Sequence, residues 1–109
     1  MQEATFLILT ALAAQPRHGY GIIQSVEALS DGDVKLRPGT LYGALDRLAG
    51  QGLIAVDHEE AVDGRLRRYY RLTDTGTDLL AQEAERWRRR TAAAEAQLGR
   101  RPGLTGGAA

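Results

Sequence analysis

The stretch Leu36-Arg-Pro-Gly-Thr-Leu-Tyr-Gly-Ala-Leu-Asp-Arg-Leu-Ala-Gly-Gln-Gly-Leu-Ile54 decides how the rest of the chain is arranged. A helix is expected to begin at Pro38, because proline suits the first helical position and no interior one. Three leucines at intervals of four and three residues give this helix one apolar stripe: Leu41, Leu45 and Leu48. Gly50 and Gly52 end it. The sequence therefore predicts a short amphipathic helix at the centre of the fold.

The opposite face of this helix is small and polar. It carries Gly43, Asp46, Arg47 and Gly50, with Thr40 and Tyr42 on its flanks. A face of small, hydroxyl and guanidinium groups can lie deep in a DNA groove, as the reading of base edges requires. However, any three-turn helix on a small domain has a polar outer face, so this helix does not decide the function by itself.

A basic hairpin follows the helix. The segment Arg65-Leu-Arg-Arg-Tyr-Tyr-Arg-Leu72 carries four arginines in seven residues and no acid, and Asp63-Gly64 before it is a turn signal. Alternation along this strand predicts that Tyr70 packs inward, whereas Arg65 and Arg67 point to solvent or to phosphate. A short helix followed by a basic hairpin is typical of the DNA-binding end of a winged helix-turn-helix.

Two further helices are expected before this unit. Residues 3–14 are apolar around more than half of the helix, so this helix is either buried on two sides or meets another chain. Residues 20–29 form a second amphipathic helix, and Val34 to Leu36 are expected to form a short strand beside the hairpin. The predicted fold class is mainly α with a small β-hairpin, and residues 1–72 are assigned to the winged helix-turn-helix domain.

A long helix is expected to begin at Thr73, a good N-cap residue, and to end near Leu98. Its apolar or small positions follow a heptad spacing: Leu80, Ala84, Trp87, Thr91, Ala94 and Leu98. A helix of this length reaches roughly 39 Å, farther than the preceding core can cover. We therefore expect residues 73–98 to form a dimerisation helix of a homodimer, although a helix folded back on its own domain is the alternative. Residues 99–109 are expected to be a disordered tail.

Composition excludes several classes of function. The 109 residues include no cysteine, and no apolar run is long enough to span a bilayer, so a cytoplasmic protein without disulfides is expected. A Gly-rich phosphate loop, paired metal ligands and an activated nucleophile are all missing, so we expect neither an enzyme nor a cofactor. With His18 and His58 as the two histidines, a metal sensor is disfavoured, and His18 is expected to make a structural hydrogen bond.

Local motifs along residues 7–76 resemble the PadR family of bacterial transcriptional regulators. They are, in chain order, His18-Gly-Tyr-Gly21, Gly39-Thr-Leu-Tyr42, Leu45, Arg47-Leu48, Gly52-Leu-Ile54, Gly64-Arg65, Arg68-Tyr-Tyr70 and Leu72-Thr73 with Gly76. The short C-terminal part resembles the subgroup with a single dimerisation helix. The resemblance implies a dimeric repressor that binds a palindromic operator and releases it when an effector or stress acts. In the family, the helix carrying Gly39–Tyr42 enters the major groove, and the hairpin lies near the minor groove.

Two residues depart from the family pattern. Arg37 replaces a small polar residue that would cap the reading helix, and Gly43 replaces a proline. From the residues and the resemblance together, double-stranded DNA is the expected partner, and the candidate DNA-binding residues are Lys35, Arg37, Thr40, Tyr42, Arg47, Arg65 and Arg67. The alternative is a winged-helix module that binds a protein or a small molecule without reading DNA, which the zero net charge and Asp46 favour slightly.

Trp87 is a candidate ligand-binding residue. The simple interpretation is that this tryptophan packs in the dimer seam, as large aromatic residues usually do. Its seam neighbours Ala84, Thr91 and Ala94 are small, however, which leaves space beside a flat ring. The resemblance adds that some relatives with this short architecture bind flat drug-like molecules between their two subunits, so a planar apolar effector is the second interpretation.

Overall fold

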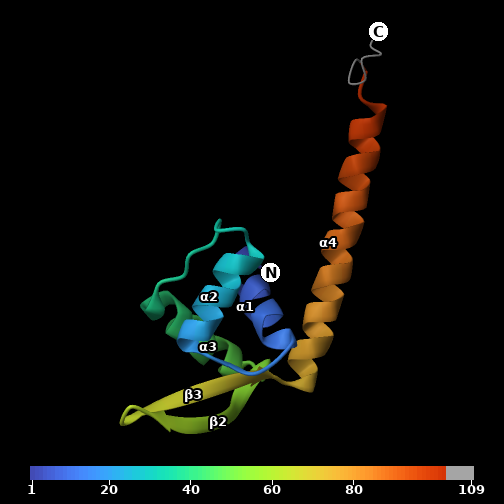
Figure 1. The fold of residues 1–109 in the computed structure, drawn as a ribbon. Coiled ribbons are helices and arrows are strands. Elements are labelled where there is room, and N and C mark those ends of the chain that lie inside the picture. The colour runs from blue at the N-terminus through green and yellow to red at the C-terminus, as the bar shows by residue number, and fades with distance from the viewer. Residues whose placement is uncertain (103–109) are drawn as a thin grey trace.

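The computed structural model describes residues 1–102 and contains four helices and three strands within that range. The elements are, in chain order, α1 (Glu3–Ala13), β1 (Arg17–His18), α2 (Gly19–Leu29), α3 (Pro38–Gly50), β2 (Ile54–Val62), β3 (Arg65–Leu72) and α4 (Asp74–Arg100). Figure 1 shows α1, α2 and α3 packed together, with the β2–β3 hairpin extending to one side and α4 rising away from both. The expected fold class, a winged helix-turn-helix with a long C-terminal helix, is confirmed.

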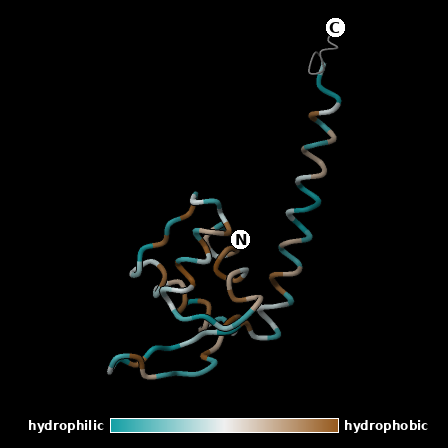
Figure 2. Tube along the Cα trace, viewed as in Figure 1, coloured by the Kyte–Doolittle hydropathy of each residue, from teal (hydrophilic) through white to brown (hydrophobic). Residues whose placement is uncertain are grey.

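The core lies between the first three helices and the base of the hairpin. Its fully buried large side chains are Ile8, Leu9, Ile22, Val26, Leu41, Leu45 and Leu48. The alternative of two-sided burial is correct for α1, because this helix packs against α2, α4 and β3. Hydrophobic segments gather in this helical head in Figure 2, whereas the hairpin and the far part of α4 are mostly hydrophilic.

The third strand of the sheet is not the one that the sequence suggested. Val34 and Leu36 form no strand; they pack, partly buried, against the hydrophobic core. The edge position is occupied by β1 instead, so that the strand order is β1-β3-β2, with Arg17 opposite Tyr70 and His18 opposite Tyr69. The Nε of Arg17 also donates to the carbonyl oxygen of Ala11 at 2.7 Å, which ties β1 to the end of α1.

The first turn of α4 is tightly joined to the head, the unit formed by α1, α2, α3 and the base of the hairpin. The hydroxyl oxygen of Thr73 accepts from the Gly76 amide at 3.0 Å and donates to the Gly52 carbonyl at 2.6 Å, as its N-cap role predicted. Leu79 and Leu80 pack against the core. Glu83 Oε1 lies 3.4 Å from the amino group of Met1, and farther along α4 leaves the three-helix core. The molecule extends 68 Å along its longest axis.

Every side chain from Trp87 to Arg100 is exposed in the single chain. The helix ends at Arg100 instead of near Leu98, so Gly99 and Arg100 are helical and not part of a tail. The disorder expected for the rest of residues 99–109 concerns mainly residues 103–109, which lie outside the described range. None of the helices within residues 1–102 is long and apolar enough to cross a membrane.

Candidate nucleic-acid interface

A groove of ≈830 Å³ lies between α3, the N-terminus of α2 and the hairpin. Its walls are formed by His18, Gly19 and Tyr20 from the β1–α2 junction, by Tyr42 and Asp46 from α3, and by residues of the hairpin that include Glu59, Asp63, Arg65 and Arg67. Of the seven candidate DNA-binding residues, the structure brings Tyr42, Arg65 and Arg67 together here.

Tyr42 is positioned by a close contact with Gly19. A Cβ atom at Gly19 would lie 2.9 Å from Cζ of Tyr42, so the phenol ring rests where another residue would have its side chain. The sequence left open whether this tyrosine contacts DNA or stacks on the wing, which is the β2–β3 hairpin. In the structure its ring contacts the start of α2 and remains 49% exposed, which leaves one part of it free for a partner.

The other candidate residues lie outside the groove. Lys35 and Arg37 are exposed on the loop that leads into α3; Arg37 occupies the N-cap position without a side-chain cap. Thr40 is exposed in the first turn of α3. Arg47 points toward α1, where its Nη2 donates to the hydroxyl of Thr5 at 3.4 Å. Arg47 is therefore on the opposite flank of α3 from Tyr42, and its contact with DNA remains a prediction.

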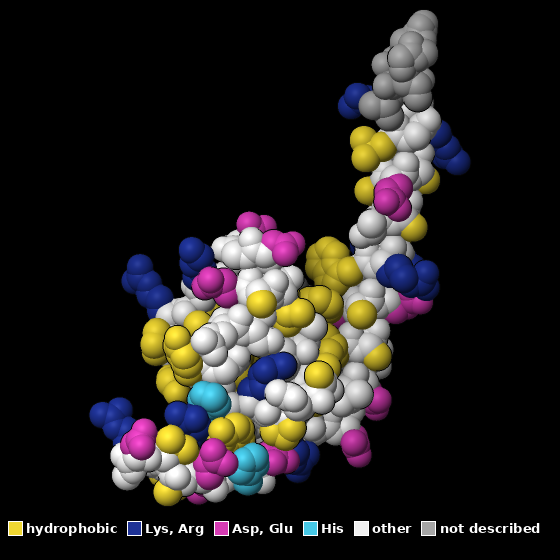
Figure 3. Space-filling model, in the orientation of Figure 1, with side chains coloured by type: hydrophobic (Ala, Val, Ile, Leu, Met, Phe, Trp, Pro, Cys, Tyr) yellow, Lys and Arg dark blue, Asp and Glu magenta, His cyan; other side chains and the backbone are white. Residues whose placement is uncertain are grey.

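The hairpin is less basic than β3 alone suggested, because β2 supplies an acid for two of the arginines. Arg68 Nε donates to Glu59 Oε2 at 3.1 Å, which raises the pKa of Arg68, and Arg71 Nε lies 3.9 Å from Asp57 Oδ1. For Arg65 and Arg67 no ion pair is found within the described range. Figure 3 shows basic and acidic side chains mixed along the hairpin.

The register of the hairpin explains these pairs, and the sequence contains the signal for it. Counting back from the two-residue turn at Asp63-Gly64, whose residues both have positive φ, places Glu59 opposite Arg68 and Glu60 opposite Arg67. A β-bulge between Val56 and His58 then shifts the pairing. The acids of β2 were visible in the sequence, but they were not aligned with the arginines.

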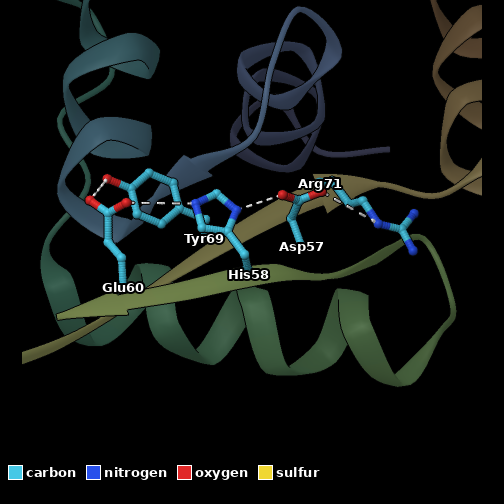
Figure 4. Close-up of polar contacts among 5 residues, drawn as sticks. All are labelled: Asp57, His58, Glu60, Tyr69 and Arg71. Carbon is cyan, nitrogen blue, oxygen red and sulfur yellow. Dashed lines mark hydrogen bonds and ion pairs between the residues drawn. The ribbon is translucent and has the colours of Figure 1, made fainter.

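A chain of polar contacts runs along one face of the wing, as Figure 4 shows. The His58 ring stacks on Tyr69, with ring centroids 4.4 Å apart, and its Nδ1 lies 2.6 Å from Asp57 Oδ2. The hydroxyl of Tyr69 donates to Glu60 Oε1 at 3.1 Å. These contacts join β2 to β3 beside the bulge and hold the wing as a unit.

His18 differs from its expected role. It occupies the N-cap position of α2, but its side chain makes no cap hydrogen bond. Its ring instead faces Tyr69, with centroids 5.2 Å apart. Burial lowers the pKa of His18, Arg67 lowers it further, and Glu60 opposes the shift. A group of three or more potential metal ligands is not found within residues 1–102.

The predicted seam lies along the part of α4 that leaves the head. Leu80 is half-buried against its own core, whereas Trp87 is 45% exposed and Leu98 is 53% exposed. The guanidinium of Arg86 lies over the indole of Trp87, 5.2 Å from the ring centroid. The ligand-binding and dimerisation roles of these residues remain predictions.

The three-helix head, the hairpin beside α3 and the groove between them define a winged helix-turn-helix protein with an extended C-terminal helix. Residues 8–82 match the model of the "Transcriptional regulator PadR-like family". The chain therefore belongs to the PadR-like family, which consists of transcriptional regulators and not of enzymes.

Several known proteins are similar to this chain. The transcriptional regulator Rv3488 of Mycobacterium tuberculosis is 40% identical over 76 residues, which cover 70% of this chain and 67% of that protein. An uncharacterised 37.1 kDa protein in transposon TN4556 of Streptomyces fradiae is 43% identical over 82 residues, and the match spans 75% of this chain but 22% of that protein. The chain thus spans about a fifth of the length of the latter relative.

Solved structures share the same fold. A PadR family transcription regulator from Clostridium difficile R20291 has a TM-score of 0.75 and 27% identity, and the match covers 89% of this chain and 99% of that chain. Bacillus subtilis PadR, solved in complex with operator DNA, has a TM-score of 0.68 over 76% of this chain and 47% of that chain. At 20% identity, the latter likeness is one of fold alone.

Proposed function

We propose that the protein is a sequence-specific DNA-binding regulator that acts as a homodimer and represses transcription from a palindromic operator. The observation that carries this proposal is the groove between α3 and the wing, where Tyr42, Arg65 and Arg67 converge. Two of these side chains are cations without an ion pair in the described part of the chain, so their charge is available to phosphates. Such a regulator would act in the cytoplasm, where the DNA is.

In this proposal residues 1–72 are the DNA-binding head. Helix α3 enters the major groove with Thr40, Tyr42 and Arg47, while Arg65 and Arg67 of the wing contact the adjacent backbone. Lys35 and Arg37 lead into α3 from an exposed loop and contact the flanking phosphates. The operator-bound relative from B. subtilis has this fold, which supports the arrangement.

The experiment is a titration of a labelled duplex from the region upstream of the protein's own gene, followed by fluorescence anisotropy. Binding that unlabelled duplex of the same sequence competes away, and that a shuffled duplex does not, is the expected result. Equal competition by the two duplexes would contradict sequence-specific binding. If the protein does not bind DNA at all, the alternative is favoured, a module that binds a protein or a small molecule.

Dimerisation through residues 73–98 is the second element of the proposal. All side chains of α4 from Trp87 to Arg100 are exposed, so this part of the helix gains little stability from its own chain. We therefore expect the same helix of a second copy to pack against its heptad positions. Sedimentation equilibrium at micromolar concentration is expected to give twice the chain mass.

Leu98→Asp tests the seam without touching the head. It is expected to produce a folded monomer, because Leu98 is 53% exposed in the single chain and a buried carboxylate would be costly in the dimer. Gln97→Asp is the matched control; it adds the same charge at an exposed neighbour off the seam and should remain dimeric. A dimeric Leu98→Asp variant would contradict the assigned seam.

A planar apolar effector beside Trp87 is the third element. The indole is partly exposed on the seam, and its seam neighbours Ala84, Thr91 and Ala94 are small, so two symmetry-related rings would flank a slot. A ligand there would release DNA if it binds the non-operator geometry more tightly. Titration with planar dyes is expected to quench the indole fluorescence of the wild-type protein. In a competition assay, which does not depend on the indole, Trp87→Ala is expected to bind these dyes no longer. If the dyes compete for Trp87→Ala as they do for the wild-type protein, the tryptophan is only a packing residue.

A further inference from the structure

Asp46 is a carboxylate on the outward face of α3 with no partner in the described part of the chain. It is exposed, it lies one turn after Tyr42, and it lines the groove that faces the wing. Its side chain makes no hydrogen bond or ion pair with any residue between 1 and 102. A negative charge in the middle of a surface proposed to face DNA needs a specific explanation.

Three of the four acids of the neighbouring hairpin differ from Asp46 in this respect; the fourth, Asp63 in the hairpin turn, also makes no ion pair or side-chain hydrogen bond within residues 1–102, but it does not lie on α3. Glu59 is paired with Arg68, Asp57 contacts His58 and Arg71, and Glu60 accepts from the Tyr69 hydroxyl, so these carboxylates have partners within the protein. Asp46 has none. Its negative charge is therefore available to a group outside the chain.

The residues around Asp46 on its stripe of α3 are glycines. Glycines lie along the same stripe of α3 at helical spacing: Gly39, Gly43 and Gly50. A Cβ atom at any of the three would meet nothing within 4 Å. Because these three positions carry no side chain, the backbone of α3 can approach a partner closely along this stripe, and Asp46 is the charged side chain within it.

DNA offers few groups that accept such a carboxylate. Phosphates repel it, and guanine and thymine present acceptor atoms in the major groove. Cytosine presents the N4 amino group as a donor, and aspartate is one of the side chains that accept from it. Adenine also has an amino donor, but its N7 acceptor lies beside that donor and repels a second carboxylate oxygen.

We propose that Asp46 reads a cytosine in each half-site of the operator by accepting a hydrogen bond from its N4 amino group. This inference rests on the proposed function, DNA reading by α3, and it names one base that α3 specifies. A mismatch at that position is expected to weaken binding by about five- to a hundredfold. The carboxylate otherwise repels phosphates, so it lowers the affinity for DNA that lacks the cytosine.

An Asp46→Asn variant tests the proposal, because it is expected to change the preferred base. Asparagine keeps the shape of the side chain but gains an amino donor, and it pairs in bidentate manner with N6 and N7 of adenine. The preferred base at one position of each half-site is therefore expected to change from cytosine to adenine. Asp46→Ala is expected to lose the preference at that position alone. Asp78→Asn is the matched control, because it removes an exposed negative charge on α4 and should keep the cytosine.

The experiment is the selection of bound duplexes from a random-sequence library with the full chain and these variants, followed by anisotropy titration of the selected sites. A change confined to one position per half-site supports the proposal. An unchanged consensus for Asp46→Asn and Asp46→Ala overturns it while sequence-specific binding stands. Tighter binding to all sequences with the same consensus also overturns it, because the carboxylate then acts only by repulsion. If the wild-type protein selects no consensus, the proposed function itself fails.

Discussion

The ring of Tyr42 lies directly against the backbone of Gly19, so that α3 meets the start of α2 at a position where only glycine fits. A Cβ atom on Gly19 would be 2.9 Å from Cζ and 3.2 Å from Cε1 of the tyrosine. Gly19 is buried, and Tyr42 is about half exposed above it. This contact fixes where the tyrosine stands beside the groove.

Gly19→Ala is therefore expected to destabilise the protein by about 1–3 kcal/mol, because the added methyl group must push the ring or the helix aside. Urea unfolding followed by circular dichroism measures the change. Gly39→Ala is the matched control near the start of α3, where a methyl group meets open space and no loss is expected. In a Tyr42→Ala background, the cost of Gly19→Ala should largely disappear. The same cost in both backgrounds would show that the contact is not its cause.

A second close approach sets the direction of α4. The first turn of this helix packs on the backbone of Leu53, and a Cβ atom at Gly76 would lie 2.9 Å from the carbonyl carbon of that residue. A backbone carbonyl cannot rotate away as a flexible side chain can. Gly76→Ala is expected to cost about 1–3 kcal/mol in urea unfolding. Gly99→Ala, in the open part of the same helix, is expected to cost nothing; equal effects of the two variants would contradict the assignment.

The sequence predicted elements whose signals are local. Pro38 and Gly50 delimit α3 as expected, and Thr73 caps α4, because a helix end depends on a few adjacent residues. The prediction of the third strand was wrong. The observed strand, β1, has two residues and no periodicity, and its position depends on pairing with Tyr69 and Tyr70 far along the chain. Local strand propensity at Val34 and Leu36 could not compete with packing of these side chains on the core.

The candidate site was predictable in part for a similar reason. Arg65 and Arg67 were identified from alternation along one strand, and both line the groove. Arg47 points away from the groove and toward Thr5 of α1, and the periodicity of the helix alone does not predict this contact. The contact of Tyr42 with Gly19 likewise requires the packing of two helices, so the sequence left the role of this tyrosine open.

His18 is expected to make the stability depend on pH. Burial and Arg67 lower its pKa below the ordinary value of 6.5, while Glu60 opposes this and Tyr69 faces the ring. The unfolded chain therefore takes up a proton first as the pH falls below 6.5, and the free energy of unfolding decreases. Above that pH the ring is neutral in both states and the effect vanishes.

Urea unfolding of the wild-type protein and of His18→Gln between pH 7.5 and pH 5 tests this coupling. Both proteins are expected to lose stability in acid, because other groups also titrate, but the loss should be smaller for His18→Gln. A parallel loss in the two proteins would show that the histidine does not contribute.

The wing arginines are expected to separate into two classes when the salt dependence of DNA binding is measured. Arg65 and Arg67 have no ion pair in the described part of the chain, whereas Arg68 is held by Glu59 and Arg71 lies near Asp57. A cation that neutralises a phosphate releases a counterion, and each such contact adds about 0.9 to the slope of log affinity against log salt.

Arg65→Ala is therefore expected to reduce that slope by roughly one and to weaken binding to all sequences alike. Arg68→Ala is the matched control, because it removes an exposed arginine of the same strand whose charge is already balanced. It should change the slope less than Arg65→Ala does, because the charge that it removes is balanced by Glu59 in the wild-type protein. If Arg68→Ala lowers the slope as much as Arg65→Ala does, the ion pair opens on binding, and the division of the wing into free and paired cations is wrong.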